Sequence, residues 1–221
     1  MIKLRSWEYW PYYIIYLPVA CYWFWLSIKA RSFFFFSATN PGMKCGGMFG
    51  ESKKSILSMI PEQYIPVTLL FEGNSKVADV ILKIKEAALS YPIIAKPDIG
   101  ERGTFVEKIV DEIQLQRYVE KAIYKFQVQE YIAGPLELGV FYIRFPNQSE
   151  GNISSIVQKK MLEVIGDGTS SLEMLIRRYD RAKLQFHALS KRLNMEEIVP
   201  KGERRELVSI GNHCKGTTFL N

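Results

Sequence analysis

The sequence YPIIAKPDIGERGTFVEKI, residues 91–109, decides the fold that we predict for this chain. A β-branched run at residues 93–95 is followed by Lys96 and a proline, which is typical of a strand that ends at the proline. A turn that contains two glycines then leads into a second short run, residues 104–106. The stretch therefore predicts two strands joined by a flexible loop.

The loop between these strands carries groups that suit a phosphate-bearing ligand. Gly100 and Gly103 let backbone amides approach a phosphate closely, and Lys96 and Arg102 bring two cationic side chains to the same place. The loop lacks the GxxxxGK[ST] pattern of a Walker P-loop, and a strand follows it where a P-loop has a helix. A glycine-containing hairpin with solvated charges is the alternative, and both interpretations stay open here.

Composition limits the class of protein. With 221 residues, of which 48% are hydrophobic and 24% charged, the chain can bury one sizeable core or two small ones. Its net charge is +6, but basic and acidic residues are interleaved, so we predict no nucleic-acid partner. Cys21, Cys45 and Cys214 lack metal-ligand spacing and only two histidines are present, so the residues predict no metal site and favour a reduced, cytoplasmic protein.

The N-terminal segment is unusually aromatic. Residues 9–28 form a run of about twenty uncharged residues, flanked by Lys3 and Arg5 on one side and by Lys29 and Arg31 on the other. Its length suits a bilayer span, whereas its prolines and its Trp and Tyr content also suit a helix lying in the membrane interface. An aromatic helix packed on the protein's own domain is the alternative. We expect membrane contact through this segment.

The next stretch links this segment to the rest of the chain. The four phenylalanines at residues 33–36 predict a buried strand or a continuation of the helix. Six turn-forming residues in the stretch 40–50 predict irregular backbone, which is either a connector or a ligand-binding loop. We therefore predict a division into an N-terminal segment, residues 1–59, and a domain, residues 60–221.

Hydrophobic periodicity predicts an α+β domain, because strands predominate and helices are inserted between them. The predicted strands are residues 66–71, 126–132, 137–145, 153–165 and 206–210, and the predicted helices are residues 77–90, 111–125 and 171–193, with a short helical turn at 55–60. Asp111 is the expected N-cap of its helix. Ser170 and Glu173 have the spacing of a capping box for the last helix.

The order of the motifs is more informative than any one of them. That order is Lys96 with its glycine loop, QEYI at residues 129–132, Glu137, then Lys159 or Lys160, and GDG at residues 166–168. It resembles the ATP-grasp fold, and in particular the D-alanine–D-alanine ligase-like members, over roughly residues 60–221. The resemblance implies two α+β lobes that hold ATP between them.

The resemblance also implies roles for the residues of the first strands and their loop. Lys96 would contact the α- and β-phosphates, and the loop with Gly100, Arg102 and Gly103 would close over the triphosphate. Glu130, Tyr131 and Ile132 are similar to the segment whose carboxylate and backbone read the adenine edge.

Further roles follow for the later strands. Glu137 would take the ribose hydroxyls, and a second lysine, Lys159 or Lys160, would lie near the adenine and α-phosphate. Arg144 is the candidate catalytic residue, because it would face an anionic substrate, although a solvated strand charge is an equal alternative.

By this resemblance the activity is that of an ATP-dependent carboxylate–amine ligase that forms an acylphosphate, with ATP and Mg²⁺ as cofactors and a small-molecule carboxylate and amine as substrates. The family's magnesium ligands come late in its sequence, and no Glu-x-Asn follows Gly216. We therefore expect the fold to be incomplete at the C-terminus and the metal ligands to lie beyond it. A catalytically incomplete, membrane-associated nucleotide-binding protein is the alternative.

Overall fold

The computed structural model describes most of the chain. The described residues are 10–48, 50–100, 103–134, 136–208, 211 and 216–220. They fall into two compact units, Met1–Ile132 and Ala133–Asn221, which are described separately below. The expectation of a mixed fold of helices and antiparallel strands is confirmed. The predicted division at residue 59 stays a prediction.

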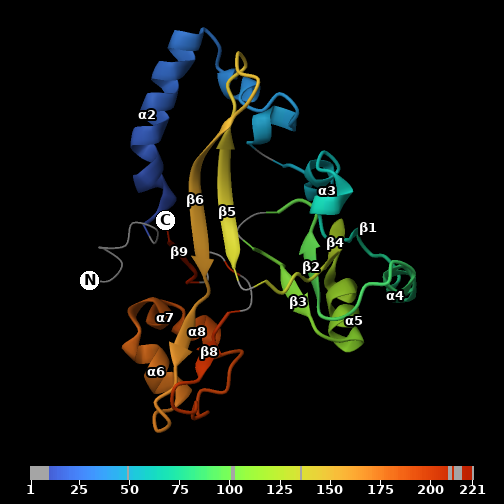
Figure 1. Cartoon of the computed structure of the whole chain (residues 1–221), viewed down its shortest axis with the longest axis vertical. Coiled ribbons are helices and arrows are strands. Elements are labelled where there is room, and N and C mark those ends of the chain that lie inside the picture. The colour runs from blue at the N-terminus through green and yellow to red at the C-terminus, as the bar shows by residue number, and fades with distance from the viewer. Residues whose placement is uncertain are drawn as a thin grey trace. The chain divides into compact units, whose positions relative to one another are not determined.

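The first unit holds a four-stranded antiparallel sheet in the order β1-β4-β2-β3 (Figure 1). Its strands are β1 (Thr68–Phe71), β2 (Ile93–Pro97), β3 (Glu107–Ile109) and β4 (Phe126–Glu130). Its helices and 3₁₀ turns are α2 (Tyr12–Ala30), η2 (Phe35–Ala38), η3 (Lys44–Gly47), α3 (Lys53–Leu57), η4 (Glu62–Tyr64), α4 (Val77–Glu86) and α5 (Glu112–Lys121).

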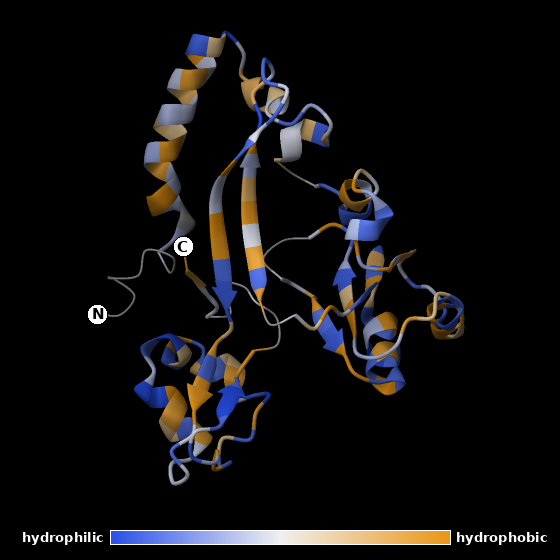
Figure 2. Ribbon diagram, in the orientation of Figure 1, coloured by the Kyte–Doolittle hydropathy of each residue, from blue (hydrophilic) through white to orange (hydrophobic). Residues whose placement is uncertain are grey.

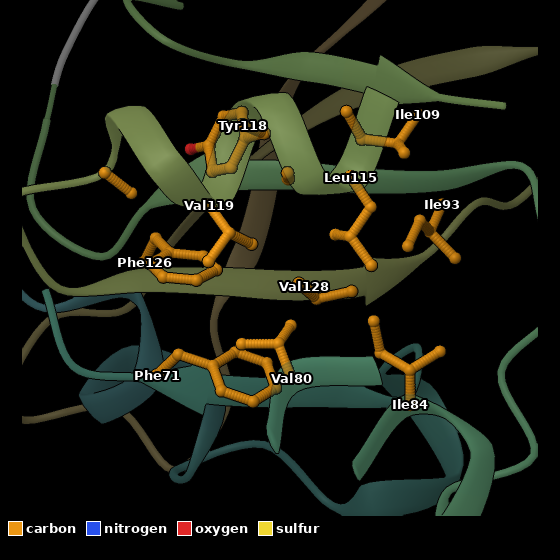
Figure 3. Close-up of a cluster of buried hydrophobic side chains, with 12 residues drawn as sticks. Phe71, Val80, Ile84, Ile93, Ile109, Leu115, Tyr118, Val119, Phe126 and Val128 are labelled. Carbon is orange, nitrogen blue, oxygen red and sulfur yellow. The ribbon is translucent and has the colours of Figure 1, made fainter. Parts of the chain in front are cut away.

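The two faces of this sheet differ in chemistry. Ile93, Ala95 and Pro97 alternate with half-buried Ile94 and Lys96 along β2, because successive side chains of a strand point to opposite faces. The apolar face packs against α4 and α5, and the β4 side chains lie between those of the two helices (Figure 3). The buried core residues are Phe71, Val80, Ile84, Ile93, Ala95, Ile109, Leu115, Tyr118, Val119, Ala122, Phe126 and Val128. Lys96 and its polar neighbours lie on the opposite face of the sheet.

The β2–β3 hairpin is confirmed, but its second strand begins at Glu107 and not within residues 104–106. Gly103 and Phe105 both have positive φ, 69° and 54°, which is turn geometry. The Phe105 carbonyl also accepts a 3.0 Å hydrogen bond from the Tyr118 hydroxyl. Residues 103–105 therefore belong to a turn that a hydrogen bond from α5 stabilises, and the strand starts at Glu107.

The predicted helices of this unit are present with shorter bounds. Asp111 is the N-cap of α5, as predicted, and its Oδ1 accepts a 2.8 Å hydrogen bond from the Gln114 amide. The short helical turn predicted from residue 55 is α3, which begins two residues earlier because Ser52 is its N-cap.

The interpretation of the four phenylalanines is wrong. Arg31 has the left-handed conformation of a helix C-cap, φ 50°, so α2 ends before them. Phe33 and Phe34 are 56% and 67% exposed, and the next residues form the short 3₁₀ turn η2. They form neither a buried strand nor a helix continuation. The glycine-rich stretch is irregular as predicted, with a 3₁₀ turn at η3.

The second unit contains two separate sheets. Strands β5 (Glu137–Ile143), β6 (Asn152–Lys160) and β9 (Thr218–Leu220) form one, in the order β5-β6-β9, and β7 (Glu163–Ile165) pairs with β8 (Arg204–Glu206) in the other. Its helices are α6 (Leu172–Arg178), α7 (Asp180–Leu184) and α8 (Phe186–Leu189). The core of the unit lies around the β7–β8 pair and these helices.

Three predictions for this unit are corrected. The single strand at residues 153–165 is two strands, β6 and β7, because the chain changes partner between them. The single helix at residues 171–193 is three, since the extended backbone of Tyr179, φ −99° and ψ 109°, separates α6 from α7, and Gln185, φ −96° and ψ 0°, separates α7 from α8. The N-cap is Ser171, whose Oγ accepts from the Met174 amide, so the Ser170 capping box is wrong. Ser170 instead bonds to Asp167.

Candidate functional site

A chain of hydrogen bonds connects three strands on the polar face of the first unit's sheet. Lys96 Nζ on β2 donates to Gln129 Oε1 on β4 at 2.7 Å, and Gln129 Nε2 donates to Thr68 Oγ1 on β1, also at 2.7 Å. The antiparallel registers place these side chains on one face, because Gln129 lies opposite both Ile94 and Thr68. Lys96 is therefore held in one position by neutral partners.

A second lysine reaches the same place from α3. Lys53 Nζ donates to the carbonyl oxygens of Asp98 and Gly100, at 3.2 and 3.0 Å. The buried Asp98 carboxylate fixes the start of α3, since its Oδ1 accepts from the Lys54 amide at 3.0 Å and from Gln127 Nε2 at 2.6 Å. Sequence reasoning did not place Lys53 here, because 45 residues separate it from Asp98.

The pKa values at this site reflect crowded positive charge. Burial lowers the pKa of Lys96, and the charge of Lys53 lowers it further. Burial alone would raise the pKa of Asp98, but hydrogen bonds from the Lys54 amide, Ser52 and Gln127, together with the Lys53 charge, outweigh it and leave the pKa lowered. The charge of Lys53 contributes to both shifts, which places it close to Lys96 and Asp98.

A third cation lies on the same face. Lys108 of β3 is opposite Ile94 in the register, and its ammonium lies 3.9 Å from the centre of the Tyr131 ring. Tyr131 was predicted as part of the adenine-reading segment. Lys108 was not predicted from the sequence. The register of the hairpin places its side chain on the same face of the sheet as Lys96.

The glycine loop is described only in part. Gly103 has φ 69°, which favours glycine, and the carbonyl of Gly100 accepts from Lys53. Arg102 lies outside the described residues. The loop is therefore attached to α3 through the lysine that also approaches Lys96.

The predicted adenine-reading segment begins at the last residue of β4, Glu130, whose carboxylate accepts a hydrogen bond. Glu130 Oε2 accepts a 3.3 Å hydrogen bond from the Val67 amide, and the Glu130 amide donates to the Val67 carbonyl at 2.9 Å. Tyr131 is half-buried, and Ile132, where the unit ends, is 63% exposed.

In the second unit, strand register separates the two lysine candidates. Lys159 lies directly opposite Glu137 and forms an ion pair with it. Lys160 points to the other face, where its Nζ is 4.0 Å from Glu163 Oε1. Lys160 also lines a cavity of about 510 Å³, together with Leu162, Val164, Leu175 and Arg178.

Arg144 is not brought close to the Glu137–Lys159 pair. It is exposed and follows the last residue of β5, seven residues from Glu137. At 3.4 Å per residue this corresponds to roughly 24 Å along the strand.

The described part of the chain provides no group of three or more His, Cys, Asp or Glu side chains that could hold a metal ion. We therefore assign no magnesium ligand and derive no chemical step through the metal.

Comparison with known proteins gives weak similarities. No protein-family model matches the chain, and no curated protein matches it. Similar solved structures include the VanG D-Ala:D-Ser ligase from Enterococcus faecalis, with 20% identity, TM-score 0.37 and coverage of 48% of this chain and 29% of that one. For D-alanine–D-alanine ligase from Helicobacter pylori the identity is 14%, the TM-score 0.39, and the coverage 48% and 32%.

A bifunctional glutathione synthetase from Pasteurella multocida is 14% identical, with TM-score 0.28 and coverage of 70% of this chain and 23% of that one. The chain thus spans a third or less of each of these three proteins.

Proposed function

We propose that the chain binds ATP, with the triphosphate on the polar face of the sheet β1-β4-β2-β3. The observation that carries this proposal is the placement of Lys96 and Lys53 beside the glycine loop, where burial lowers the pKa of Lys96 and the charge of Lys53 lowers it further. Two cations fixed beside a glycine-containing loop are the arrangement that a polyphosphate requires.

The partner of Lys96 supports an anionic ligand. Lys96 donates to the amide oxygen of Gln129, which carries no net charge. Among the described residues no carboxylate forms an ion pair with Lys96. The repulsion between the ammonium groups raises the free energy of the unliganded protein, and a triphosphate would remove that penalty on binding.

We propose further that the chain is an ATP-dependent carboxylate–amine ligase of the ATP-grasp class. Lys96 and the loop with Gly100, Arg102 and Gly103 hold the phosphates, and Glu130, Tyr131 and Ile132 read the adenine. The motif order of the sequence supports these roles.

Glu137 takes the ribose hydroxyls, and Lys159 is the second lysine. Its pairing with Glu137 favours Lys159 over Lys160. Arg144 would contact an anionic substrate away from this pair.

In such a ligase, a carboxylate oxygen attacks the γ-phosphorus and the bond to the β-phosphate oxygen breaks, which gives an acylphosphate and ADP. The amine nitrogen then attacks the acyl carbon, inorganic phosphate leaves, and the nitrogen loses a proton to give the amide. The contribution of Lys96 and Lys53 is to position the triphosphate and to offset its charge.

Equilibrium binding of ATP to the whole chain tests the proposal. Lys96→Met preserves the length of the side chain and removes its charge, and we expect it to weaken ATP binding by at least about tenfold, as for one charge-assisted hydrogen bond. Lys121→Met, on the exposed last turn of α5, is the matched control and leaves the affinity unchanged. Equal affinity in both variants would contradict the proposal.

A catalytically incomplete nucleotide-binding protein is the second candidate function. It is favoured by the lack of a metal-holding acidic group among the residues that the structure covers. ADP release that depends on an added carboxylate and amine supports the ligase, whereas ATP binding without such release in a broad substrate screen supports the second candidate.

A further inference from the structure

Helix α2 exposes apolar side chains all the way round. Its exposed large side chains are Tyr13, Ile14, Tyr16, Leu17, Val19, Tyr22, Phe24, Trp25 and Ile28. At 3.6 residues per turn these positions are distributed around the whole circumference. Figure 2 shows orange and pale colours along most of α2 and deep blue at its C-terminal end.

The protein itself covers little of this helix. Trp23 contacts the rings of Phe33 and Phe36, with centroids 4.4 and 6.4 Å away, and Ser27 is buried beside it. Within the window Tyr13–Ala30 only 6% of the residues are buried. A core helix of a soluble domain would be mostly buried, so that interpretation of the apolar sequence is disfavoured.

The dimensions and ends of α2 match a lipid bilayer. Its 19 residues extend about 28 Å, close to the roughly 30 Å of the hydrocarbon layer. Lys29 and Arg31 mark its C-terminal end, and Lys29 lies 5.2 Å from the Trp25 ring, a pairing suited to the headgroup level. The Ser27 hydroxyl donates to the Trp23 carbonyl at 3.0 Å, so its polar group is satisfied within the helix.

We propose that α2 spans a membrane once, with its C-terminal end on the cytoplasmic side. An interfacial helix would need one polar face, and α2 has none. Three cationic residues lie in the last turn of the span or within about 20 residues after it, whereas two precede it, which is the direction of the positive-inside rule. They are Lys29, Arg31 and Lys44 on one side and Lys3 and Arg5 on the other. The span does not depend on the ATP proposal, although cytoplasmic ATP is available on the predicted side.

The native cysteines test the span in membrane vesicles whose cytoplasmic face points outward. The full chain is prepared as single-cysteine variants that retain either Cys21, in the middle of α2, or Cys45, after it. A membrane-impermeant maleimide is expected to label Cys45 in intact vesicles and to label Cys21 only after denaturation. A third variant carries Ser6→Cys as its only cysteine, before α2, and is expected to react only when detergent opens the vesicles.

Each alternative gives a different result. Labelling of the Ser6→Cys variant in intact vesicles would mean an interfacial helix, and recovery of the chain in the supernatant of an alkaline carbonate wash would mean a soluble one. Loss of an N-terminal tag would mean a cleaved signal sequence. Each of these would overturn the proposal.

A pair of charged variants provides a second test. Leu17→Arg, on α2, is expected to reduce the membrane-bound fraction several-fold, because a cation in mid-span opposes insertion. Leu82→Arg places the same charge at a 57% exposed site on α4 and leaves the fraction unchanged. Equal fractions for both would contradict the span, and the cysteine labelling does not depend on either variant folding.

Discussion

Lys96 donates a 2.7 Å hydrogen bond to Gln129 across the β2–β4 pair, on the face of the sheet opposite the α4–α5 core. The bond crosses diagonally, since Lys96 lies opposite Gln127 and Gln129 lies opposite Ile94. A half-buried cation bonded to a neutral amide is not compensated by that partner.

The affinity for ATP is predicted to fall at high pH. The pKa of Lys96 is below its ordinary value of 10.5, and a triphosphate binds the protonated form. Affinity is therefore full below the lowered pKa and is lost as the pH rises through it, while the unliganded protein gains stability between that value and 10.5. Isothermal titration from pH 7 to pH 10 measures this, and the decline should be absent in Lys96→Met. An identical pH profile in the variant would assign the titration to another group.

Asp98→Asn is predicted to destabilise the first unit by about 1–3 kcal/mol, because a neutral amide accepts the hydrogen bonds from the Lys54 amide, Gln127 and Ser52 more weakly than the carboxylate does. The pKa of Asp98 is lowered, so its contribution is present above the ordinary value of 3.8 and lost as the pH falls through the folded value. Urea unfolding at several pH values measures this. Glu86→Gln, on the exposed side of α4, is the control and should differ from the native chain by less than about 0.5 kcal/mol.

Neighbouring residues Ile93 and Ile94 are predicted to respond differently to truncation. Ile93 is fully buried in the core, and Ile94 is half-buried on the polar face. Ile93→Ala should cost about 2–5 kcal/mol of unfolding free energy, and Ile94→Ala less than half of that. Equal costs would show that the sheet buries both faces alike.

The Glu137–Lys159 pair is predicted to add little stability. Its side chains are 49% and 26% exposed, and double-mutant cycles of such pairs give about 0.2–1 kcal/mol. Glu137→Gln, Lys159→Met and the double variant measure the coupling by urea unfolding. The same variants are expected to weaken ATP binding, because the proposal has Glu137 and Lys159 contact the nucleotide. A coupling of several kcal/mol with unchanged ATP affinity would give the pair a structural role instead.

Local sequence signals predicted much of the fold. The strand that begins at residue 93 and ends at the proline, and the cap at Asp111, depend on neighbours within a few residues, and both are confirmed. The β6–β7 break was not predictable in this way, because β6 pairs with β9 and β7 with β8, segments about forty or more residues away in sequence. The interruption of the last helix at Tyr179 has no glycine or proline to signal it.

Only the site residues that lie in the sequence motifs were predicted. Lys96, Glu137 and the alternatives Lys159 or Lys160 were named from the motif order, and the strand register then placed Lys159 opposite Glu137. Lys53 and Lys108 were not predicted, since Lys53 arrives through the docking of α3 on Asp98 and Lys108 through the register of a hairpin whose second strand began later than predicted. Lys53 and Lys108 therefore add positive charge through tertiary contacts, which local sequence patterns do not predict.

Labelling with an acyl-phosphate derivative of ATP tests the central claim most directly. Such a reagent transfers its acyl group to lysine amines beside the bound phosphates, and mass spectrometry identifies the modified residue. We predict acylation of Lys96 or Lys53, suppressed by excess ATP, with Lys121 unmodified. Labelling that spares both lysines, or that excess ATP does not suppress, would contradict a triphosphate site on this face of the sheet.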